Sequence, residues 1–427
     1  MMGELTTVMA QPERSRSRPD RRRGLLISLI CSLWLTGCAG GFALPNLLYL
    51  ATSANSDQEI NAELISDFRE RLGGVAADYR QLHPATRFQF GIYPDAGIVE
   101  AMRRRNRAGL GPDLMFVNGD TAKQLVDQGL ADPFPLTPSL EHLFNPADLQ
   151  RMRTDSGALA GLPILIQTQV ACFNRRRLPD PPDTLEDLLS ASARGHSIGF
   201  SIELRALFWT AGSVGSLEAI ERATAEKPLE PKQLESIETW LAWLQNANDQ
   251  QRVTFYASQT SALQEFRAGR LDWLPCSSIS LPGLRKHLGD SLGVASLPSG
   301  PGGQPSPINR LRVLALGRSS SRAGRERALS FSRFSVNPLV QRGLTLGSQT
   351  VLPANRFVKV PVQSSQALQA ISSSHVAGER TAGVARLLHD NDDRLDSTQG
   401  LMNALVFGEV NPKKATTDLV RLLRQQP

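Results

Sequence analysis

The feature that most constrains the fold of this 427-residue chain is a repeated alternation of strand-length and helix-length segments. Residues 47–51 form an apolar run of strand length, after which Ile60, Leu64 and Phe68 recur at helical spacing. The alternation continues with a half-buried strand, a basic helix and an apolar strand, expected over residues 87–92, 98–107 and 114–117. Short strands that alternate with helices are typical of an α/β fold, and we expect each sheet to be mostly parallel.

The same alternation resumes after Pro163, which indicates a second domain. Residues 164–173 form an apolar run long enough to cross from one domain to the other, and residues 299–307 form a Gly/Pro-rich loop. Further helices are expected over residues 185–193, 234–244, 325–334 and 401–423. The length is sufficient for two or three domains.

The first residues have the organisation of a secretory signal peptide. Six arginines precede an apolar stretch over residues 25–35, and small residues follow it. The stretch has only half of the ~20 residues that a transmembrane helix needs, so an anchor of that kind is the weaker interpretation. The sequence Leu35-Thr36-Gly37-Cys38 resembles the lipobox of bacterial lipoproteins.

That resemblance implies that residues 1–37 are removed and that residues 38–45 form a short tether. Cys38 would be lipidated and become the mature N-terminus. The protein would then be exported and held by its lipid on the periplasmic side of a bacterial membrane. A plain signal peptide with an incidental cysteine is the alternative.

The charge of the chain argues against nucleic acid as a partner. The formal net charge is +6, and the leader of residues 1–37 contributes six arginines against three acidic residues. The rest of the chain therefore has a net charge near +3, with acidic and basic residues interspersed. A nucleic-acid-binding protein would concentrate its basic residues on one face or in one run, and no such run follows the leader.

Two cysteines, Cys172 and Cys276, remain beyond the leader and its lipobox. Disulfides persist in exported proteins, so a Cys172–Cys276 bridge is one interpretation. Two buried thiols that pack as small apolar side chains are the other, because the sequence does not give the distance between the two Cα atoms.

Several short segments beyond residue 80 occur in a characteristic order. They are LHPATRF at 82–88, GLGPDLMF at 109–116, GLADPF at 129–134, LAGLP at 159–163, FNRRRL at 173–178, PPDTLEDL at 181–188, FRAGR at 266–270, GVASLP at 293–298 and VLPA at 351–354. In this order they resemble family 1 extracellular solute-binding proteins of ABC importers, the class that includes maltose-binding protein. Leu185 departs from the pattern, because that family usually has tryptophan at this position.

The resemblance implies a type II, periplasmic-binding-protein-like fold with two α/β lobes joined by three chain crossings. Lobe one would contain residues 45–163 and 298–318, and lobe two residues 164–297 and 319–427. A ligand held in the cleft would shift the equilibrium between open and closed states of the hinge. Such a protein would act as a monomer together with ABC permease subunits, without a cofactor.

Motifs for catalysis are absent from the sequence: it has no phosphate-binding loop, dinucleotide fingerprint or nucleophile elbow, and no histidine pair at zinc-binding spacing. We therefore expect neither an enzyme nor a metal site. The expected ligand is a sugar, oligosaccharide or polyol glycoside, bound by polar and aromatic side chains in loops at the carboxyl ends of strands. The candidate contacts are Ser53, Asn55, Phe116, Asn118, Asp120, Gln167, Arg205, Trp209, Trp273, Ser277 and Gln349.

Each candidate also has a purely structural interpretation. Trp209 and Trp273 are equally typical of a buried core, and Asp120 is equally typical of a helix cap. Two other ligands remain open within this fold: polyamines, which would use cleft acids, and iron, although the four tyrosines are never adjacent in sequence. A non-transport envelope lipoprotein, acting as a scaffold or a sensor subunit, is the alternative outside transport.

Overall fold

The computed structural model describes residues 46–54, 60, 62–384, 387–388 and 393–425. The predicted signal peptide, the tether, Cys38 and Asn55 lie outside the described residues. Among those described, no helix is long and apolar enough to cross a membrane.

The first sheet has seven strands in the order β12-β5-β11-β3-β1-β2, with β4 paired to β11. Its central pairs β1–β2 and β1–β3 are parallel, whereas β11 runs antiparallel to β3, β4 and β5. The strands are β1 (Asn46–Ala54), β2 (Thr86–Pro94), β3 (Leu114–Asn118), β4 (Ala131–Asp132), β5 (Leu162–Gln167), β11 (Arg310–Gly317) and β12 (Leu352–Pro353).

Helices cover the first sheet and bury its apolar side chains. Leu50 in β1 and Val117 in β3 are fully buried, as is Ala315 in β11. The helices are α2 (Ala62–Leu82), α3 (Asp95–Arg107), α4 (Gly119–Asp127), α5 (Pro138–Glu141), α6 (Pro146–Arg151), α14 (Arg322–Ser335) and α15 (Pro338–Ser348). Local sequence sets several of their starts: Asn145 caps α6 and Ser321 caps α14 through side-chain oxygens that accept backbone N–H groups.

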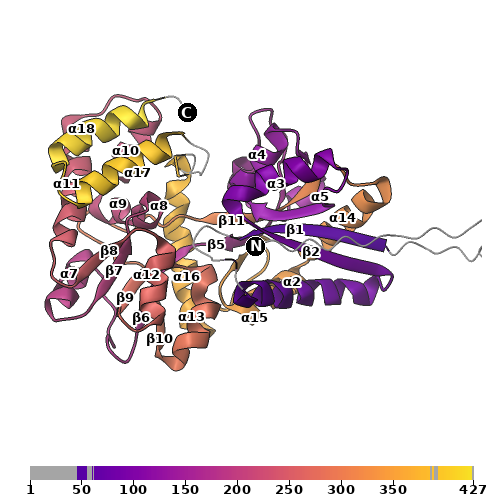
Figure 1. Cartoon of the computed structure of the whole chain (residues 1–427), viewed down its shortest axis with the longest axis horizontal. Helices are drawn as coiled ribbons and strands as arrows, with labels where there is room; N and C mark the ends of the chain where they lie inside the picture. Colours follow the sequence, from indigo (N-terminus) through magenta and orange to yellow (C-terminus); the bar gives the residue numbers. More distant parts are fainter. Residues whose placement is uncertain (1–45, 55–59, 61, 385–386, 389–392, 426–427) are drawn as a thin grey trace, which may run out of the picture. The chain divides into compact units, whose positions relative to one another are not determined.

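The second sheet has five strands in the order β10-β6-β9-β7-β8. They are β6 (Gln169–Asn174), β7 (Ile198–Ser201), β8 (Val253–Tyr256), β9 (Trp273–Ser277) and β10 (Leu292–Ala295). The helices are α7 (Leu185–Ala193), α8 (Leu204–Leu207), α9 (Trp209–Val214), α10 (Leu217–Thr224), α11 (Pro231–Asn248), α12 (Gln259–Arg267), α13 (Leu281–Leu288), α16 (Gln366–Gly378), α17 (Asp393–Val406) and α18 (Pro412–Leu423). Figure 1 shows the two sheets with their helices as two groups, which we call lobe one and lobe two.

Both sheets are mixed rather than mostly parallel, which corrects the expectation from sequence. In lobe two β7 is parallel to β8 and β9, but β6 is antiparallel to β9 and β10. The antiparallel pairs involve the strands at the crossings. The chain leaves the first sheet through β5, enters the second through β6, and returns to the first sheet as β11. Alternation of elements along the chain does not reveal the direction of such returning strands.

The chain passes between the two sheets three times, and one crossing differs from the predicted boundaries. It passes from β5 to β6 near Thr168, and from β10 to β11 between residues 296 and 309. The third crossing follows β12, because α14, α15 and β12 pack on lobe one. Residues 319–353 therefore belong to lobe one and not to lobe two. The helical pattern of 325–334 fits either lobe, so sequence alone placed it wrongly.

Trp209 and Trp273 lie in the core of lobe two with no exposed surface. Their rings are 6.2 Å apart and both pack against Phe200. The expectation that they stack on a ligand is therefore not met, because no face of either indole ring reaches solvent. Their area stabilises lobe two instead.

A disulfide joins Cys172 of β6 to Cys276 of β9, with the Cα atoms 5.9 Å apart. The two strands are antiparallel neighbours, and Cys276 pairs directly with Val170, two residues before Cys172. The structure therefore confirms the disulfide rather than two free buried thiols, the two interpretations that the sequence left open. Its sulfur atoms are also buried, so the site is a covalent link inside the core of the lobe.

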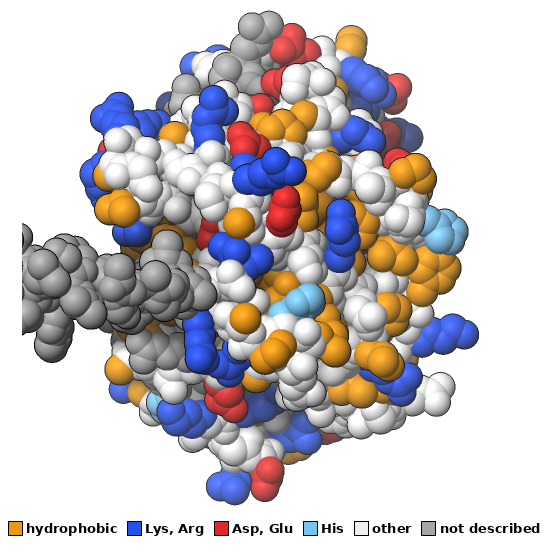
Figure 2. Space-filling view, turned by 90° about the vertical axis from the view of Figure 1, so that its right-hand side faces the viewer, with side chains coloured by type: hydrophobic (Ala, Val, Ile, Leu, Met, Phe, Trp, Pro, Cys, Tyr) orange, Lys and Arg blue, Asp and Glu red, His pale blue; other side chains and the backbone are white. Residues whose placement is uncertain are grey.

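The surface has mixed charge. On the face in Figure 2, Lys and Arg side chains are spread among acidic, polar and apolar ones and do not form one continuous basic area. Within the described residues, no cluster of three or more His, Cys, Asp or Glu side chains could hold a metal ion.

Candidate functional site

Arg312 organises the carboxyl ends of β1 and β3, where the sequence predicted ligand contacts. Its side chain is 2 % exposed, on a strand that is otherwise apolar over residues 311–317. The guanidinium donates to the hydroxyl of Ser53 at 3.1 Å, to its carbonyl at 2.8 Å and to the carbonyl of Phe116 at 2.8 Å. It also donates to the Asn118 amide oxygen at 3.1 Å and stacks over the Phe116 ring, 4.7 Å from its centre.

Burial lowers the pKa of Arg312 to about 10, and the charge of Asp95 partly offsets that effect. Asp95 begins α3 and accepts a hydrogen bond from the Asn118 amide nitrogen at 2.9 Å. Asn118 therefore bridges a buried cation and a carboxylate. Ser53, Phe116 and Asn118 are thus held by Arg312, and Asn118 also lines a cavity.

Two small hollows lie where lobe one, lobe two and the crossings meet, and together we call them the cleft. The first hollow is lined by lobe-one residues of α3, α4 and α6 together with Arg205 of lobe two and residues 308–311 of the returning crossing. The second is lined by the first crossing, by β9, and by Glu203, Arg205 and Ala206 at the start of α8. Arg205, Ile308 and Arg310 line both. Each hollow has a volume of about 50 Å³.

Five of the predicted contacts meet in the cleft. Asn118 and Asp120 line its first hollow and Gln167 and Ser277 its second, while Arg205 lines both. Gln349 lies elsewhere: its amide oxygen accepts a hydrogen bond from Ser365, and its carbonyl accepts one from Arg285. It ends α15 with a positive φ of 49°, so it caps that helix and does not line the cleft.

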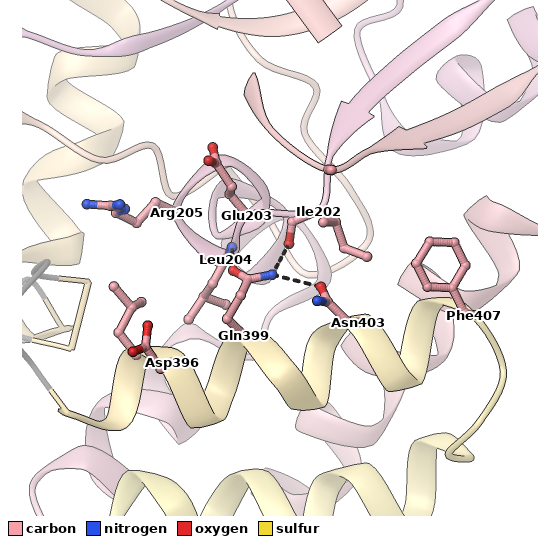
Figure 3. Close-up of a pocket in the computed structure, with 10 residues that line it drawn as sticks. Ile202, Glu203, Leu204, Arg205, Asp396, Gln399, Asn403 and Phe407 are labelled. Atoms are coloured by element: carbon pink, nitrogen blue, oxygen red, sulfur yellow. Dashed lines mark hydrogen bonds between the residues drawn. The ribbon is translucent and has the colours of Figure 1, made fainter. Parts of the chain in front are cut away.

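A larger cavity of about 390 Å³ continues from the cleft into lobe two, since Glu203 and Arg205 line both. We call it the side pocket. Residues 202–205, which lead into α8 and begin it, form one wall and α17 the other, and Figure 3 shows Asp396 and Phe407 at opposite ends of the α17 wall. Phe407 is 63 % exposed, so its ring is available to a ligand.

Gln399 of α17 holds the loop wall of the side pocket in place. Its amide oxygen accepts from the Leu204 backbone N–H at 2.7 Å, and its amide nitrogen donates to the Ile202 carbonyl at 2.8 Å and to Asn403 at 3.0 Å (Figure 3). Glu203 accepts from the backbone N–H of Gln259 at 3.2 Å. Helix α17 therefore fixes the start of α8, about 195 residues earlier in the chain.

Gln169 couples the cleft loop to a crossing. Its amide nitrogen donates to the Arg205 carbonyl at 3.0 Å, and its amide oxygen accepts from the Ile308 N–H at 3.0 Å. The sequence pattern predicts Gln167 as a contact but does not point to Gln169. It also missed Arg312, although an arginine inside the apolar strand RLRVLALG was a usable sign of a buried polar group.

A second polar cluster lies at the crossing, around His375 of α16. Arg151 donates to the Asn309 carbonyl at 2.8 Å, and the Asn309 side chain donates to the His375 carbonyl at 2.8 Å. Burial lowers the pKa of His375, and the charge of Arg151 acts in the same direction, whereas Asp148 and Glu379 oppose it. The cluster joins α6 of lobe one to α16 through the crossing. Protonation of His375 therefore affects the stability of the junction between the lobes.

We expect the stability of this junction to fall in acid because of His375. A lowered pKa in the folded state means that the unfolded chain binds more protons as the pH falls through the unfolded value of 6.5. The contribution of neutral His375 to the free energy of unfolding is therefore fully present above that pH and is lost as the pH falls below it. The free energy of unfolding of the wild type should fall more between pH 7.5 and 5.5 than that of His375→Gln, measured by urea unfolding.

Asp148, whose pKa burial raises and the charge of His375 lowers, is present in both proteins, so the comparison measures the histidine together with its coupling to Asp148. Equal losses of unfolding free energy in the two proteins would contradict the prediction.

Comparisons with known proteins agree with this architecture. A galactooligosaccharide-binding protein of Bacillus subtilis (strain 168) is 26 % identical over 158 residues, which are 35 % of this chain and 37 % of that protein, so the match spans about a third of the relative. The crystal structure of the GacH receptor of Streptomyces glaucescens GLA.O has a TM-score of 0.67 at 14 % identity, covering 89 % of this chain and 100 % of the receptor.

The maltose-maltodextrin binding protein of Alicyclobacillus acidocaldarius has a TM-score of 0.64 at 17 % identity, covering 89 % of this chain and 100 % of that one. At these identities the structures show the fold alone, and they confirm the expected two-lobed fold. The family model described as bacterial extracellular solute-binding protein matches residues 75–369, which is most of the described chain. The chain therefore belongs to the bacterial extracellular solute-binding proteins, a family of binding proteins and not of enzymes.

Proposed function

We propose that this protein captures a carbohydrate in the cleft and delivers it to the permease of an ABC importer. The observation that carries the proposal is the convergence of hydrogen-bonding side chains on the cleft: Asp120 from lobe one, Arg205 and Ser277 from lobe two, and Gln167 from the first crossing. Sugars need this kind of polar lining, together with an apolar surface for their CH groups. Phe407 in the side pocket offers such a surface.

The relatives support a carbohydrate over other solutes. The GacH receptor was crystallised with acarbose, and a solute-binding protein from Thermotoga lettingae TMO, with a TM-score of 0.65 at 14 % identity, was crystallised with α-D-tagatose. The Bacillus subtilis relative is named for galactooligosaccharides. A sugar, oligosaccharide or polyol glycoside is therefore the ligand class that we propose.

Capture would proceed by closure of the lobes. Asp120 and Ser277 lie in different lobes, and a ligand that contacts both favours the state in which they are close. Gln169 links the loop of Arg205 to Ile308, so a movement of that loop is transmitted to the crossing. Binding and release then need only a population shift of the hinge, without covalent chemistry.

Two alternative ligands are less well supported. A polyamine would need an excess of acids, but Asp95, Asp120 and Glu203 in the cleft face the three arginines 151, 205 and 310. For iron, the structure brings Tyr49 and Tyr93 together with their hydroxyls 2.8 Å apart. Burial raises the pKa of Tyr49, which disfavours the phenolate that iron needs, and neither tyrosine lines the cleft.

Thermal melting of residues 39–427 with a panel of sugars, polyols, polyamines and metals tests the proposal. A ligand at 100 times its dissociation constant adds about 2.7 kcal/mol to the free energy of unfolding. We expect the melting temperature to rise by a few degrees with at least one carbohydrate. A rise with putrescine alone would overturn the carbohydrate proposal, and no rise with any ligand would favour a non-transport lipoprotein.

Asp120→Asn is expected to weaken binding of the best carbohydrate from that panel by about 10- to 100-fold, because hydrogen bonds to a charged group contribute about 1.5–3 kcal/mol. Titration calorimetry measures the change. Asp127→Asn is the matched control, since Asp127 is exposed at the other end of the same helix α4. Equal affinities of the two variants would remove Asp120 from the site.

We also propose that Cys38 carries the lipid anchor, on the basis of the sequence Leu35-Thr36-Gly37-Cys38. The substitution Cys38→Ser should move the protein from the membrane fraction to the soluble periplasmic fraction of the expressing bacterium. Retention of Cys38→Ser in the membrane fraction, with no lipid found on the wild type by mass spectrometry, would contradict the anchor.

A further inference from the structure

Arg310 is a cation of the cleft for which no described residue supplies an acceptor. It begins β11 and pairs with Gln167 of β5 in the antiparallel ladder, at the base of both hollows. Its side chain is half-buried. Within the described part of the chain, its guanidinium makes neither a hydrogen bond nor an ion pair with a protein group.

The other charged groups around Arg310 already have protein partners. The Asp95 carboxylate accepts from Asn118 and Thr121, and the Glu203 carboxylate accepts from Ser201 and Gln259. Arg151 of the first hollow donates to the Asn309 carbonyl and lies 3.8 Å from Asp148. Each of these groups is therefore used to build the cleft.

Two further arginines lie near Arg310, and Asp95, Asp120 and Glu203 line the same two hollows. Arg312 lies two residues along the same strand, and the charge of Arg310 lowers the pKa of Arg312 through repulsion. Arg205 reaches the same two hollows from lobe two. An anion placed there would contact Arg310 from lobe one and Arg205 from lobe two.

A planar guanidinium pairs best with a carboxylate, which accepts two parallel N–H bonds. In a cleft otherwise lined by groups suited to hydroxyls, the ligand that offers both is a saccharide with a carboxylate. We propose that the cleft selects acidic saccharides, with the carboxylate of a uronic acid unit bound by Arg310. The inference rests on the proposed carbohydrate function and specifies its ligand class.

Two pairs of disaccharides, each differing only in one carboxylate, test this inference. They are digalacturonate with α-1,4-galactobiose, and cellobiouronic acid with cellobiose. We expect the mature wild-type protein to bind the acidic member of at least one pair 10-fold or more tightly than its neutral partner, by titration calorimetry at low salt. In Arg310→Gln the ratio of the two affinities should fall towards one, and Arg310→Lys should retain an intermediate ratio.

The control is Arg342→Gln, an exposed arginine of α15 outside the cleft, which should keep the wild-type ratio. Melting curves of all variants establish that each is folded. Equal or tighter binding of the neutral members, or an unchanged ratio in Arg310→Gln, would overturn the inference. If neutral sugars still raise the melting temperature, the proposed carbohydrate function stands without the preference for acidic saccharides. If no carbohydrate binds, the proposed function and this inference both fail.

Discussion

Replacing Arg312 with methionine is expected to lower the free energy of unfolding by about 3–5 kcal/mol. The substitution leaves the carbonyl of Ser53 and the amide oxygen of Asn118 buried without the guanidinium donor that now serves them, while the carbonyl of Phe116 keeps the hydroxyl of Thr52 as a donor. Methionine fills much of the same volume, so the loss reflects the missing hydrogen bonds more than a cavity. Urea unfolding of the two proteins at neutral pH measures it.

Arg312→Lys should lose less, because lysine keeps the charge but cannot supply the same fork of donors. The control is Arg318→Met, just beyond the end of β11, whose side chain is 61 % exposed and lies 3.6 Å from Asp132. An exposed pair of this kind contributes about 0–1 kcal/mol. A loss below about 1 kcal/mol for Arg312→Met, within the range of that control, would mean that the buried guanidinium does not organise the ends of β1 and β3.

Removing the disulfide in the double variant Cys172→Ala, Cys276→Ala is expected to cost about 2–5 kcal/mol of unfolding free energy. The bridge closes a loop between residues 104 positions apart, and so it restricts the unfolded chain strongly. The wild type unfolded in the presence of a reductant should match the double variant without one. Urea unfolding under both conditions makes the comparison.

Alkylation gives an independent check on the same bond. Without a reductant, Cys172 and Cys276 should resist labelling even in the unfolded chain, and both should label after reduction. Full labelling of the unfolded chain without a reductant would show that the thiols are free. The double variant would then test only the packing of two small buried side chains.

The sequence was sufficient for the fold class and for most elements of lobe one. The run at 47–51, the alternating strand at 87–92 and the apolar strand at 114–117 lie within β1, β2 and β3. Periodicity reports which residues are buried within an element. It does not report strand direction, which is why the antiparallel course of β11 and the assignment of α14 and α15 to lobe one needed the structure.

The candidate site was predicted in part for a similar reason. Asn118, Asp120 and Gln167 follow or end strands, where open sheets place ligands, and all three line the cleft. Arg310 and Gln399 belong to segments far along the chain, and only tertiary pairing brings them to the cleft and the side pocket. The tryptophans failed as predicted contacts because a large aromatic residue near a strand end fits a core as well as a ligand.

The position of β11 has a consequence for the order in which the protein is made. This strand lies between β3 and β5 in the middle of the first sheet, yet it is synthesised after every strand of lobe two. Until residue 317 has been added, β3 keeps an open edge that could pair with another chain. The sheet of lobe one is thus begun first and completed last, so a nascent chain cannot finish that sheet until every strand of lobe two has been made.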